Sequence, residues 1–258
     1  VAVLLHLPFA FVASRAVNQT SQASFVHKYK PIEIVVTKTS DDERVERKFK
    51  ITTTNCNLYI GDKAIEVTTV LAKDENGNPL KNSDGKVYGT AKVDNLPCSY
   101  ISSTGKVVKV KYKIEEIETP ECYEQPKAQT VTPETDKENT VSVENKPKTG
   151  SIKVIKKAET IGSTETIPLP DITFELTSDF DETFKKTAKT DQNGEITFSN
   201  LPAAYVVVDE EGKEYIKQIN YTVHEVSDEN NEAYILADDK EITIDYTGTT
   251  AADRVSEA

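Results

Sequence analysis

The sequence predicts an all-β protein made of two tandem β-sandwich domains. From residue 31 onward, short segments rich in Val, Ile, Thr and Tyr alternate with turn residues, which is typical of strands joined by hairpins. Apolar residues at the spacing of an amphipathic helix are rare. In addition, a set of strand and turn motifs occurs twice in the same order, and the lysines that end its first motif, Lys38 and Lys156, lie 118 residues apart.

The first element is an apolar run at residues 1–13. This run is too short to span a bilayer. It has the length of the hydrophobic region of a signal peptide, although no basic segment precedes it. The alternative is a buried strand that belongs to an upstream segment. Because residues 14–30 are polar and lack periodicity, we expect residues 1–30 to be a signal-peptide-like remnant followed by an extended lead-in.

Turn motifs rich in Asn, Asp and Gly separate the expected strands, at residues 76–79, 84–85, 191–194 and 211–212. Their composition superficially resembles that of calcium-binding loops. However, none of them reaches the twelve-residue ligand pattern with a closing Glu that such loops require. We therefore expect these motifs to form hairpin turns.

Each copy of the repeat contains three motifs. An apolar strand ending in Lys is followed by an Asn-Leu-Pro turn and then by a Tyr-x-aliphatic-x-Glu strand. These motifs lie at residues 34–38, 95–97 and 112–116 in the first copy and at residues 152–156, 200–202 and 221–225 in the second. A polar Pro/Gly joint separates the copies, so we expect a first domain over residues 31–146, a linker over residues 147–149 and a second domain over residues 150–258.

Strand alternation places three polar side chains on apolar faces of the first domain, since residues two apart share a face. Lys38 shares its face with Ile34 and Val36, Glu116 with Tyr112 and Ile114, and Asn145 with Val141 and Val143. Burying an isolated charge is costly. We therefore expect this amine, carboxyl and carboxamide to meet in the core.

These motifs resemble those of Cna-B domains, the SpaA-type prealbumin-like domains of Gram-positive surface adhesins and pilins. The resemblance covers residues 31–258 and is strongest at residues 141–147 and 150–156. It implies an Ig-like, prealbumin-like sandwich and an isopeptide bond, with Lys38 as nucleophile, Asn145 as electrophile and Glu116 as proton shuttle. The alternative is that the three side chains form a hydrogen-bonded core cluster or reach solvent at the strand ends.

The second copy of the repeat is less complete. Lys156 and Glu225 are in phase with their apolar faces, but Asp245, the obvious partner, directly follows Ile244 and falls on the opposite face. Glu116 precedes Asn145 by 29 residues, whereas Glu225 precedes Asp245 by only 20. We therefore expect the second domain to lack its last strand, with Asp245 on the outer face. A bulge that turns Asp245 inward is the alternative.

Charge and composition exclude several classes of function. The chain carries 31 Lys and Arg against 43 Asp and Glu, a net charge of −12. Since phosphate binding needs a basic face, nucleic acid is not an expected partner. The histidines (His6, His27 and His224) are scattered, and the cysteines (Cys56, Cys98 and Cys122) have no catalytic context. We expect no turnover enzyme, cofactor or metal site, while a disulfide between two of the cysteines is left open.

The resemblance implies stalk modules of a secreted bacterial surface protein, an adhesin or a pilin, attached to the Gram-positive cell wall. Its partners would be neighbouring domains or subunits of a surface fibre. The alternative is a recognition module that binds a host matrix protein or a glycan. The segment over residues 55–89 is long enough to build a binding face for that purpose. A third reading, accessory modules of an extracellular enzyme, requires sequence outside this chain.

Overall fold

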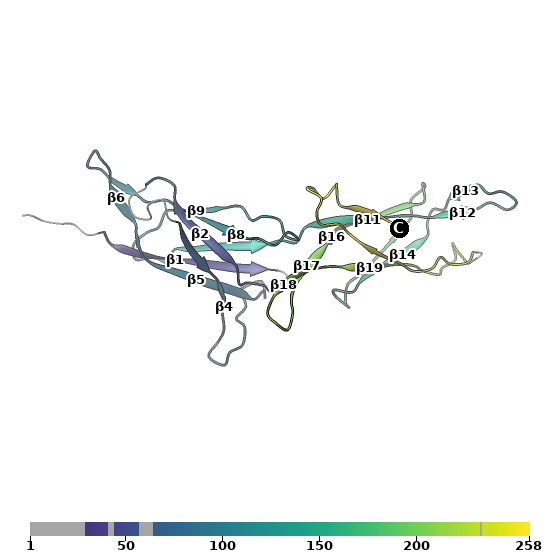
Figure 1. Ribbon diagram of the computed structural model, residues 1–258. Helices are drawn as coiled ribbons and strands as arrows, with labels where there is room; N and C mark the ends of the chain where they lie inside the picture. Colours follow the sequence, from purple (N-terminus) through teal and green to yellow (C-terminus); the bar gives the residue numbers. More distant parts are fainter. Residues whose placement is uncertain (1–28, 41–43, 57–63, 233) are drawn as a thin grey trace, which may run out of the picture.

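A computed structural model of the chain describes residues 29–40, 44–56, 64–232 and 234–258 (Figure 1). The described residues form strands, turns and loops without a helix, so the predicted all-β fold is confirmed. Accordingly, they include no helix that is long and apolar enough to cross a membrane. The predicted signal-peptide-like run at residues 1–13 lies outside the described residues, as do His6 and His27.

The first half of the molecule (residues 29–147) contains ten strands. They are β1 (Pro31–Ser40), β2 (Lys48–Thr53), β3 (Ile65–Thr68), β4 (Val70–Leu71), β5 (Tyr88–Pro97), β6 (Ser99–Ile101), β7 (Val107–Lys109), β8 (Tyr112–Ile117), β9 (Gln129–Val131) and β10 (Thr140–Asn145). One four-stranded sheet has the order β10-β1-β5-β4, and another has the order β3-β2-β8-β9. A single apolar cluster that includes Ile34, Phe49 and Ile114 draws its members from both sheets, as in a β-sandwich.

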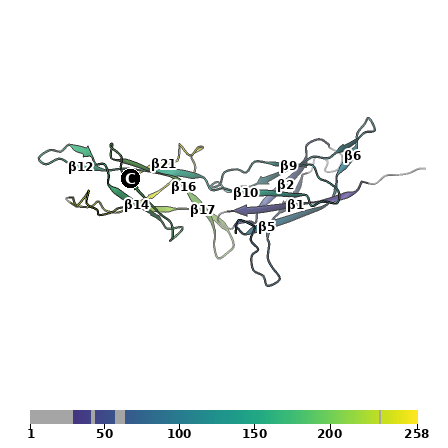
Figure 2. The same cartoon turned by 180° about the vertical axis from the view of Figure 1, so that it is seen from behind.

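The second half (residues 148–258) contains eleven strands. They are β11 (Thr149–Ile155), β12 (Lys157–Glu159), β13 (Thr166–Pro168), β14 (Thr173–Ser178), β15 (Lys185–Lys189), β16 (Glu195–Pro202), β17 (Ala204–Val208), β18 (Glu214–Gln218), β19 (Asn220–Glu225), β20 (Lys240–Thr243) and β21 (Val255–Glu257). The sheets β16-β11-β21 and β15-β14-β19-β20 enclose a second, separate apolar cluster. The two halves lie end to end in both views (Figures 1 and 2).

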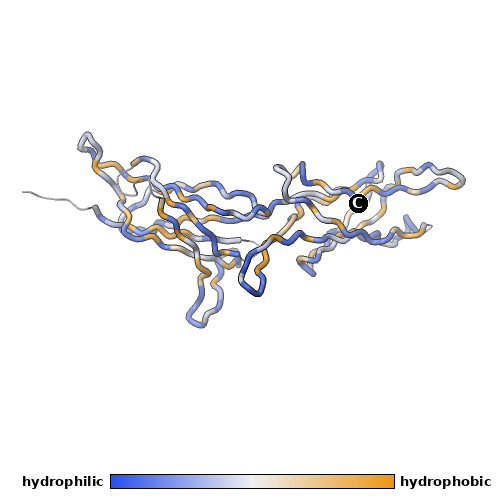
Figure 3. The backbone as a smooth tube through the Cα atoms, in the orientation of Figure 1, coloured by the Kyte–Doolittle hydropathy of each residue, from blue (hydrophilic) through white to orange (hydrophobic). Residues whose placement is uncertain are grey.

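The alternation predicted from the sequence is visible along the strands, where apolar and polar positions follow one another (Figure 3). In β10 the burial alternates residue by residue, and in β8 Tyr112, Ile114 and Glu116 are the buried positions. Residues two apart along a strand are thus buried on the same face. In β8 this places the carboxyl group of Glu116 in the core beside the apolar residues.

The two halves repeat the same local geometry at the motifs that suggested the repeat. Asn95 and Asn200, which open the Asn-Leu-Pro motifs, both adopt the left-handed conformation, with φ of 60° and 56°. The prediction that these motifs are turns is wrong: they end strands β5 and β16, opposite the points where the register with β1 and β11 shifts. Asn is among the few residues other than Gly that tolerate this conformation. Both copies thus place an Asn at the same left-handed position.

A buried tyrosine makes the same hydrogen bond in each half. The Tyr112 hydroxyl donates to the carbonyl oxygen of Pro97 over 2.8 Å, and the Tyr221 hydroxyl donates to that of Pro202 over 2.7 Å. Burial raises the pKa of both phenols far above the ordinary value, because the charged form would lose its hydration. Each hydrogen bond connects the strand that carries the motif glutamate to the end of the strand that carries the Asn-Leu-Pro motif.

The prediction that the second half lacks its last strand is wrong. Strand β21 pairs in parallel with β11, as β10 pairs in parallel with β1. The prediction assumed that the segment between the motif glutamate and the last strand has the same length in both halves. In fact Glu116 precedes β10 by 24 residues, whereas Glu225 precedes β21 by 30.

The loop between β8 and β9 joins the two halves. Within it, the backbone N–H of Glu124 donates to the carbonyl oxygen of Lys146 over 2.9 Å, and the N–H of Lys148 donates to that of Cys122 over 2.8 Å. Cys122 and Tyr123 pack with Ala204 of the second half in a small third apolar cluster. These contacts hold the residues before and after Pro147 against the β8–β9 loop, which itself packs on the second half.

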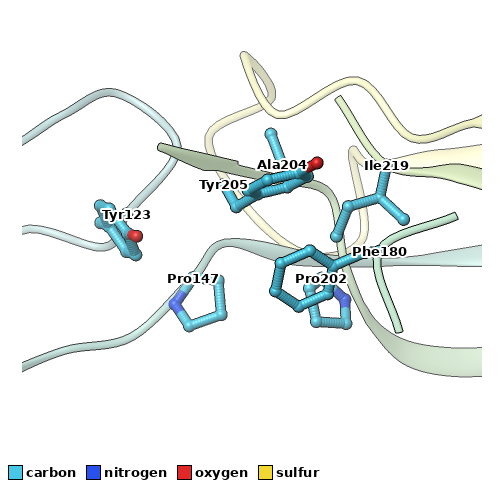
Figure 4. A pocket seen from close by; sticks show the side chains of 7 residues that line it. All are labelled: Tyr123, Pro147, Phe180, Pro202, Ala204, Tyr205 and Ile219. Carbon is cyan, nitrogen blue, oxygen red and sulfur yellow. The ribbon is translucent and has the colours of Figure 1, made fainter. Parts of the chain in front are cut away.

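An apolar pocket opens beside this joint (Figure 4). Tyr123 and Pro147 lie on the side of the first half, while Phe180, Tyr205 and Ile219 are among the residues that line it from the second half. The rings of Phe180 and Tyr205 have centroids 4.4 Å apart, a separation typical of favourable aromatic pairs. Side chains of both halves therefore contribute to a shared apolar surface.

Arg254 is a buried charge at the joint, with 3% of its surface exposed. Its guanidinium donates to the carbonyl oxygens of Thr149 (2.7 Å) and Gly248 (2.6 Å) and to Glu124 Oε1 (3.1 Å). Two of these acceptors are backbone carbonyls of the second half, in partly buried hydrogen bonds with a charged donor. We therefore expect these two bonds to account for most of what Arg254 contributes to the stability of the second half.

We expect Arg254→Ala to lower the free energy of unfolding of the second half by about 2–3 kcal/mol, because two backbone carbonyl oxygens lose their charged donor. The measurement is chemical denaturation followed by circular dichroism. Glu124→Gln is the matched control and should cost at most about 0.5 kcal/mol, since the Glu124 carboxylate is largely exposed. Equal effects of the two variants would show that the ion pair, rather than the carbonyl contacts, matters.

Candidate functional site

Lys38, Glu116 and Asn145 come together in the core of the first half. Lys38 lies on β1 and Asn145 on the adjacent strand β10, whereas Glu116 comes from β8 in the facing sheet. Their exposed fractions are 0%, 2% and 0%. The group therefore bridges the two layers of the sandwich at a place without access to solvent.

The carboxyl group of Glu116 lies between the other two side chains. Asn145 Nδ2 donates to Glu116 Oε1 over 3.0 Å, and Lys38 Nζ lies 3.7 Å from Glu116 Oε2. The Lys38 amine also donates to the carbonyl oxygen of Thr39 over 2.6 Å. Glu116 Oε2 and Asn145 Oδ1 are buried and accept no hydrogen bond from the described residues, an arrangement that costs free energy in a folded core.

This arrangement has the components needed to form an amide. A lysine amine is a nucleophile in its neutral form, and a buried site disfavours the charged ammonium. A carboxyl group in contact with both partners can accept a proton from the amine and deliver one to the leaving group. A cluster held only by hydrogen bonds would leave the two unpartnered oxygens unexplained.

In the second half, Lys156 and Glu225 form a direct ion pair. Lys156 Nζ donates to Glu225 Oε2 over 2.8 Å. The same oxygen accepts from the backbone N–H of Ala237 over 2.9 Å, and Oε1 accepts from Asn231 Nδ2 over 3.2 Å. Burial alone would raise the pKa of Glu225, but these three donors together hold it below its ordinary value. Glu225 is therefore a carboxylate at neutral pH.

Asp245, the candidate partner in the second half, does not join this pair. Its side chain is exposed, and its two oxygens accept from the backbone N–H and the hydroxyl of Thr247, each over 2.9 Å. The alternative in which a bulge turns Asp245 inward is therefore wrong. Beyond the ladder of β21 with β11, which pairs Lys153 with Glu257, the carbonyl oxygen of Ala258 accepts from the N–H of Ile155, next to Lys156.

Three contributors to these sites were not predicted: Thr119, Asn231 and the backbone N–H of Ala237. Thr119 lies in the loop after β8, and the other two lie in the loop after β19. They could not be predicted because the alternation of side chains along a strand does not extend to residues in loops. Their only common sequence signal is that each follows a motif glutamate within a dozen residues.

The remaining candidates lie apart from both sites. His224 is exposed, and its Nδ1 lies 2.6 Å from Asp239 Oδ1. Cys56, Cys98 and Cys122 are buried and form no disulfide with one another. The part of the chain that the structure describes contains no group of His, Cys, Asp and Glu side chains arranged to hold a metal ion.

The ion pair of Lys156 and Glu225 contributes to the free energy of unfolding, and this contribution depends on pH. Because the pKa of Glu225 is lower in the folded than in the unfolded protein, its contribution is complete above the unfolded pKa, about 4.3. It disappears as the pH falls through the lower folded value.

We expect Glu225→Gln to destabilise the protein by about 2 kcal/mol at pH 7. Its stability should also decline less than that of the wild type between pH 5 and pH 3. Urea unfolding over this pH series checks the expectation. Glu229→Gln, an exposed neighbour, is the control and should follow the wild type. A wild-type pH profile for Glu225→Gln would contradict the expectation.

Comparison with known sequences identifies part of the chain. The family model of the SpaA prealbumin-like fold domain matches residues 150–215. This match confirms the resemblance to SpaA-type domains over residues 150–215. The SpaA-type match runs from β11 into the β17–β18 hairpin, and it includes Lys156 but ends before Glu225. No curated protein sequence matches the chain.

Similar solved structures include two pilins. The Bacillus anthracis TIE protein is 15% identical with a TM-score of 0.47, and 88% of this chain aligns with 32% of that one, so the chain spans about a third of it. The shaft pilin SpaA from Lactobacillus rhamnosus GG is 14% identical (TM-score 0.29; coverage 88% and 96%). The minor pilin GBS52 of Streptococcus agalactiae is 13% identical (TM-score 0.32; coverage 88% and 94%).

Proposed function

We propose that the chain is a pair of tandem structural modules, over residues 31–146 and 150–258, from a secreted bacterial surface protein such as a pilin or an adhesin. The first module carries an intramolecular isopeptide bond between Lys38 and Asn145, and it performs no turnover. The Gram-positive cell wall is the proposed location, and neighbouring modules or subunits of a fibre are the proposed partners. The SpaA-type match over residues 150–215 supports the module type.

The observation that carries the proposal is the buried contact of Glu116 with Lys38 and Asn145, at 3.7 Å and 3.0 Å. Glu116 takes a proton from the lysine ammonium, and the neutral amine attacks Cγ of Asn145. A C–N bond to Nζ forms, the bond from Cγ to Nδ2 breaks, and a second lysine proton passes through the carboxyl group to the departing ammonia. Because this happens once within one chain, the product is a crosslink.

Intact mass spectrometry of the denatured full chain tests the bond. The wild-type mass should lie below the sequence mass by one ammonia molecule, whereas Glu116→Ala should have the full sequence mass because the proton shuttle is lost. Glu115→Ala is the control and should still lose ammonia, since Glu115 is partly exposed and pairs with Lys113. Full sequence mass in folded wild-type protein would leave only a hydrogen-bonded cluster.

The stalk role is favoured over host-matrix or glycan recognition because of where the described polar groups are placed. The hairpin between β4 and β5 projects beside the sandwich (Figure 1). Its turn aspartate, Asp74, is occupied by hydrogen bonds from the backbone N–H groups of Asn76 and Asn78. The reactive side chains of Lys38, Glu116 and Asn145 are buried in the core instead. A crosslink there would raise the mechanical stability of the module.

A further inference from the structure

The loop that follows β8 contacts Glu116 on β8 and the end of β10, which carries Asn145. Thr119 Oγ1 donates to Glu116 Oε1 over 3.2 Å, and Gln125 Nε2 donates to the backbone carbonyl oxygen of Glu116 over 3.0 Å. Glu124 N–H donates to the carbonyl oxygen of Lys146, the residue after Asn145. One loop thus holds the carboxyl group and the end of the strand that carries the carboxamide.

The contacts of Thr119 make the two oxygens of Glu116 different. Oε1 accepts two hydrogen bonds, from Thr119 and from Asn145. Oε2 accepts none from the described residues, and it is the oxygen that lies 3.7 Å from Lys38 Nζ. A carboxyl group fixed through one oxygen cannot rotate freely, so the other oxygen is kept available for the lysine proton.

The backbone of the loop is shaped for this contact. Glu118 adopts a left-handed conformation, with φ of 61°, which is uncommon for a residue of its type. This turn follows the end of β8 and brings the hydroxyl of Thr119 back toward Glu116, three residues earlier in the chain. The backbone strain therefore lies at Glu118, between Glu116 and Thr119, the two residues that the turn brings together.

The second half provides a contrast. There the loop after the motif glutamate supplies donors to both oxygens of Glu225, from Asn231 to Oε1 and from Ala237 N–H to Oε2. Lys156 adds a further hydrogen bond to Oε2 at 2.8 Å. Neither oxygen is left open, and the carboxylate is stabilised as an ion. In the second half, the loop after the glutamate strand thus contacts both oxygens of the carboxylate, whereas in the first half it contacts only one.

We propose that Thr119 is a positioning residue for Glu116, and that its hydroxyl accelerates formation of the Lys38–Asn145 bond by keeping Oε2 directed at the lysine. This inference rests on the proposed crosslink. Thr119 exchanges no atom in the reaction. It holds Oε1 while Oε2 accepts the lysine proton, Nζ bonds to Cγ of Asn145, and Nδ2 departs as ammonia with the proton that the carboxyl group returns.

The test follows bond formation over time in the full chain. Protein made by cell-free translation at low temperature is sampled into acid, and intact mass gives the fraction that has lost ammonia. Thr119→Val, which removes the hydroxyl but keeps the shape, should slow the reaction about tenfold, the effect of one lost hydrogen bond. Thr119→Ser should restore the wild-type rate. Thr130→Val, an exposed threonine on β9, is the control.

The outcomes separate this inference from the proposed function. If the wild type loses ammonia and Thr119→Val reacts at the same rate, the positioning role is wrong and the crosslink stands. If Thr119→Ser is as slow as Thr119→Val, the hydroxyl is not the cause, and the inference also fails. If the wild type never loses ammonia, the proposed crosslink itself is wrong. Circular dichroism of each variant establishes that the compared proteins are equally folded.

Discussion

Pulled from its two ends, the wild-type chain is expected to extend by much less than its number of residues allows. A bond between Lys38 on β1 and Asn145 on β10 would transmit force from the first strand directly to the linker. Residues 39–144, roughly 100 residues, would stay folded. At about 3.4 Å per extended residue, this withholds about 350 Å of chain.

Single-molecule force spectroscopy measures this length directly. Glu116→Ala should release the withheld length in an additional unfolding event, because without the bond the parallel β1–β10 pair can be pulled apart. Glu115→Ala should behave like the wild type. If the wild type and Glu116→Ala extend to the same length, force does not pass through a covalent bond in the first half.

The buried polar residues could be predicted because strand alternation is local and has a fixed period. Lys38, Glu116 and Asn145 each follow two apolar residues at alternate positions, and all three are buried. The same logic placed Lys156 and Glu225 on inner faces and Asp245 on the outer one. None of these placements requires knowledge of the loops between strands.

The parts that could not be predicted depend on loops. Strand β21 was missed because the count from Glu225 assumed the loop lengths of the first half. Thr119 and Asn231 were missed because their hydrogen bonds to the motif glutamates come from turns outside the strands. A loop conformation depends on backbone angles such as that of Glu118, for which a glutamate gives no signal in the sequence.

Loss of the bond should also lower the thermodynamic stability of the first half strongly. We expect Glu116→Gln to reduce the free energy of unfolding by about 4–5 kcal/mol, by analogy with a disulfide that closes a loop of roughly 100 residues. For a domain of this size, this corresponds to a fall in Tm of about 15–30 °C. Differential scanning calorimetry of the full chain, in which the two halves are followed as separate transitions, gives the measurement.

Glu116→Gln also distinguishes a covalent bond from a hydrogen-bonded cluster. The Gln carboxamide has the shape of the carboxyl group, and its oxygen can still accept from Thr119 and Asn145. If the wild type contains only hydrogen bonds between a neutral amine, a neutral carboxyl group and the carboxamide, the substitution should therefore cost about 1 kcal/mol. If the wild type is crosslinked, the cost should be several times larger, because the unfolded chain regains the freedom that the closed loop had removed. A loss near 1 kcal/mol would contradict the bond, and reducing agents should leave the wild-type Tm unchanged in either case.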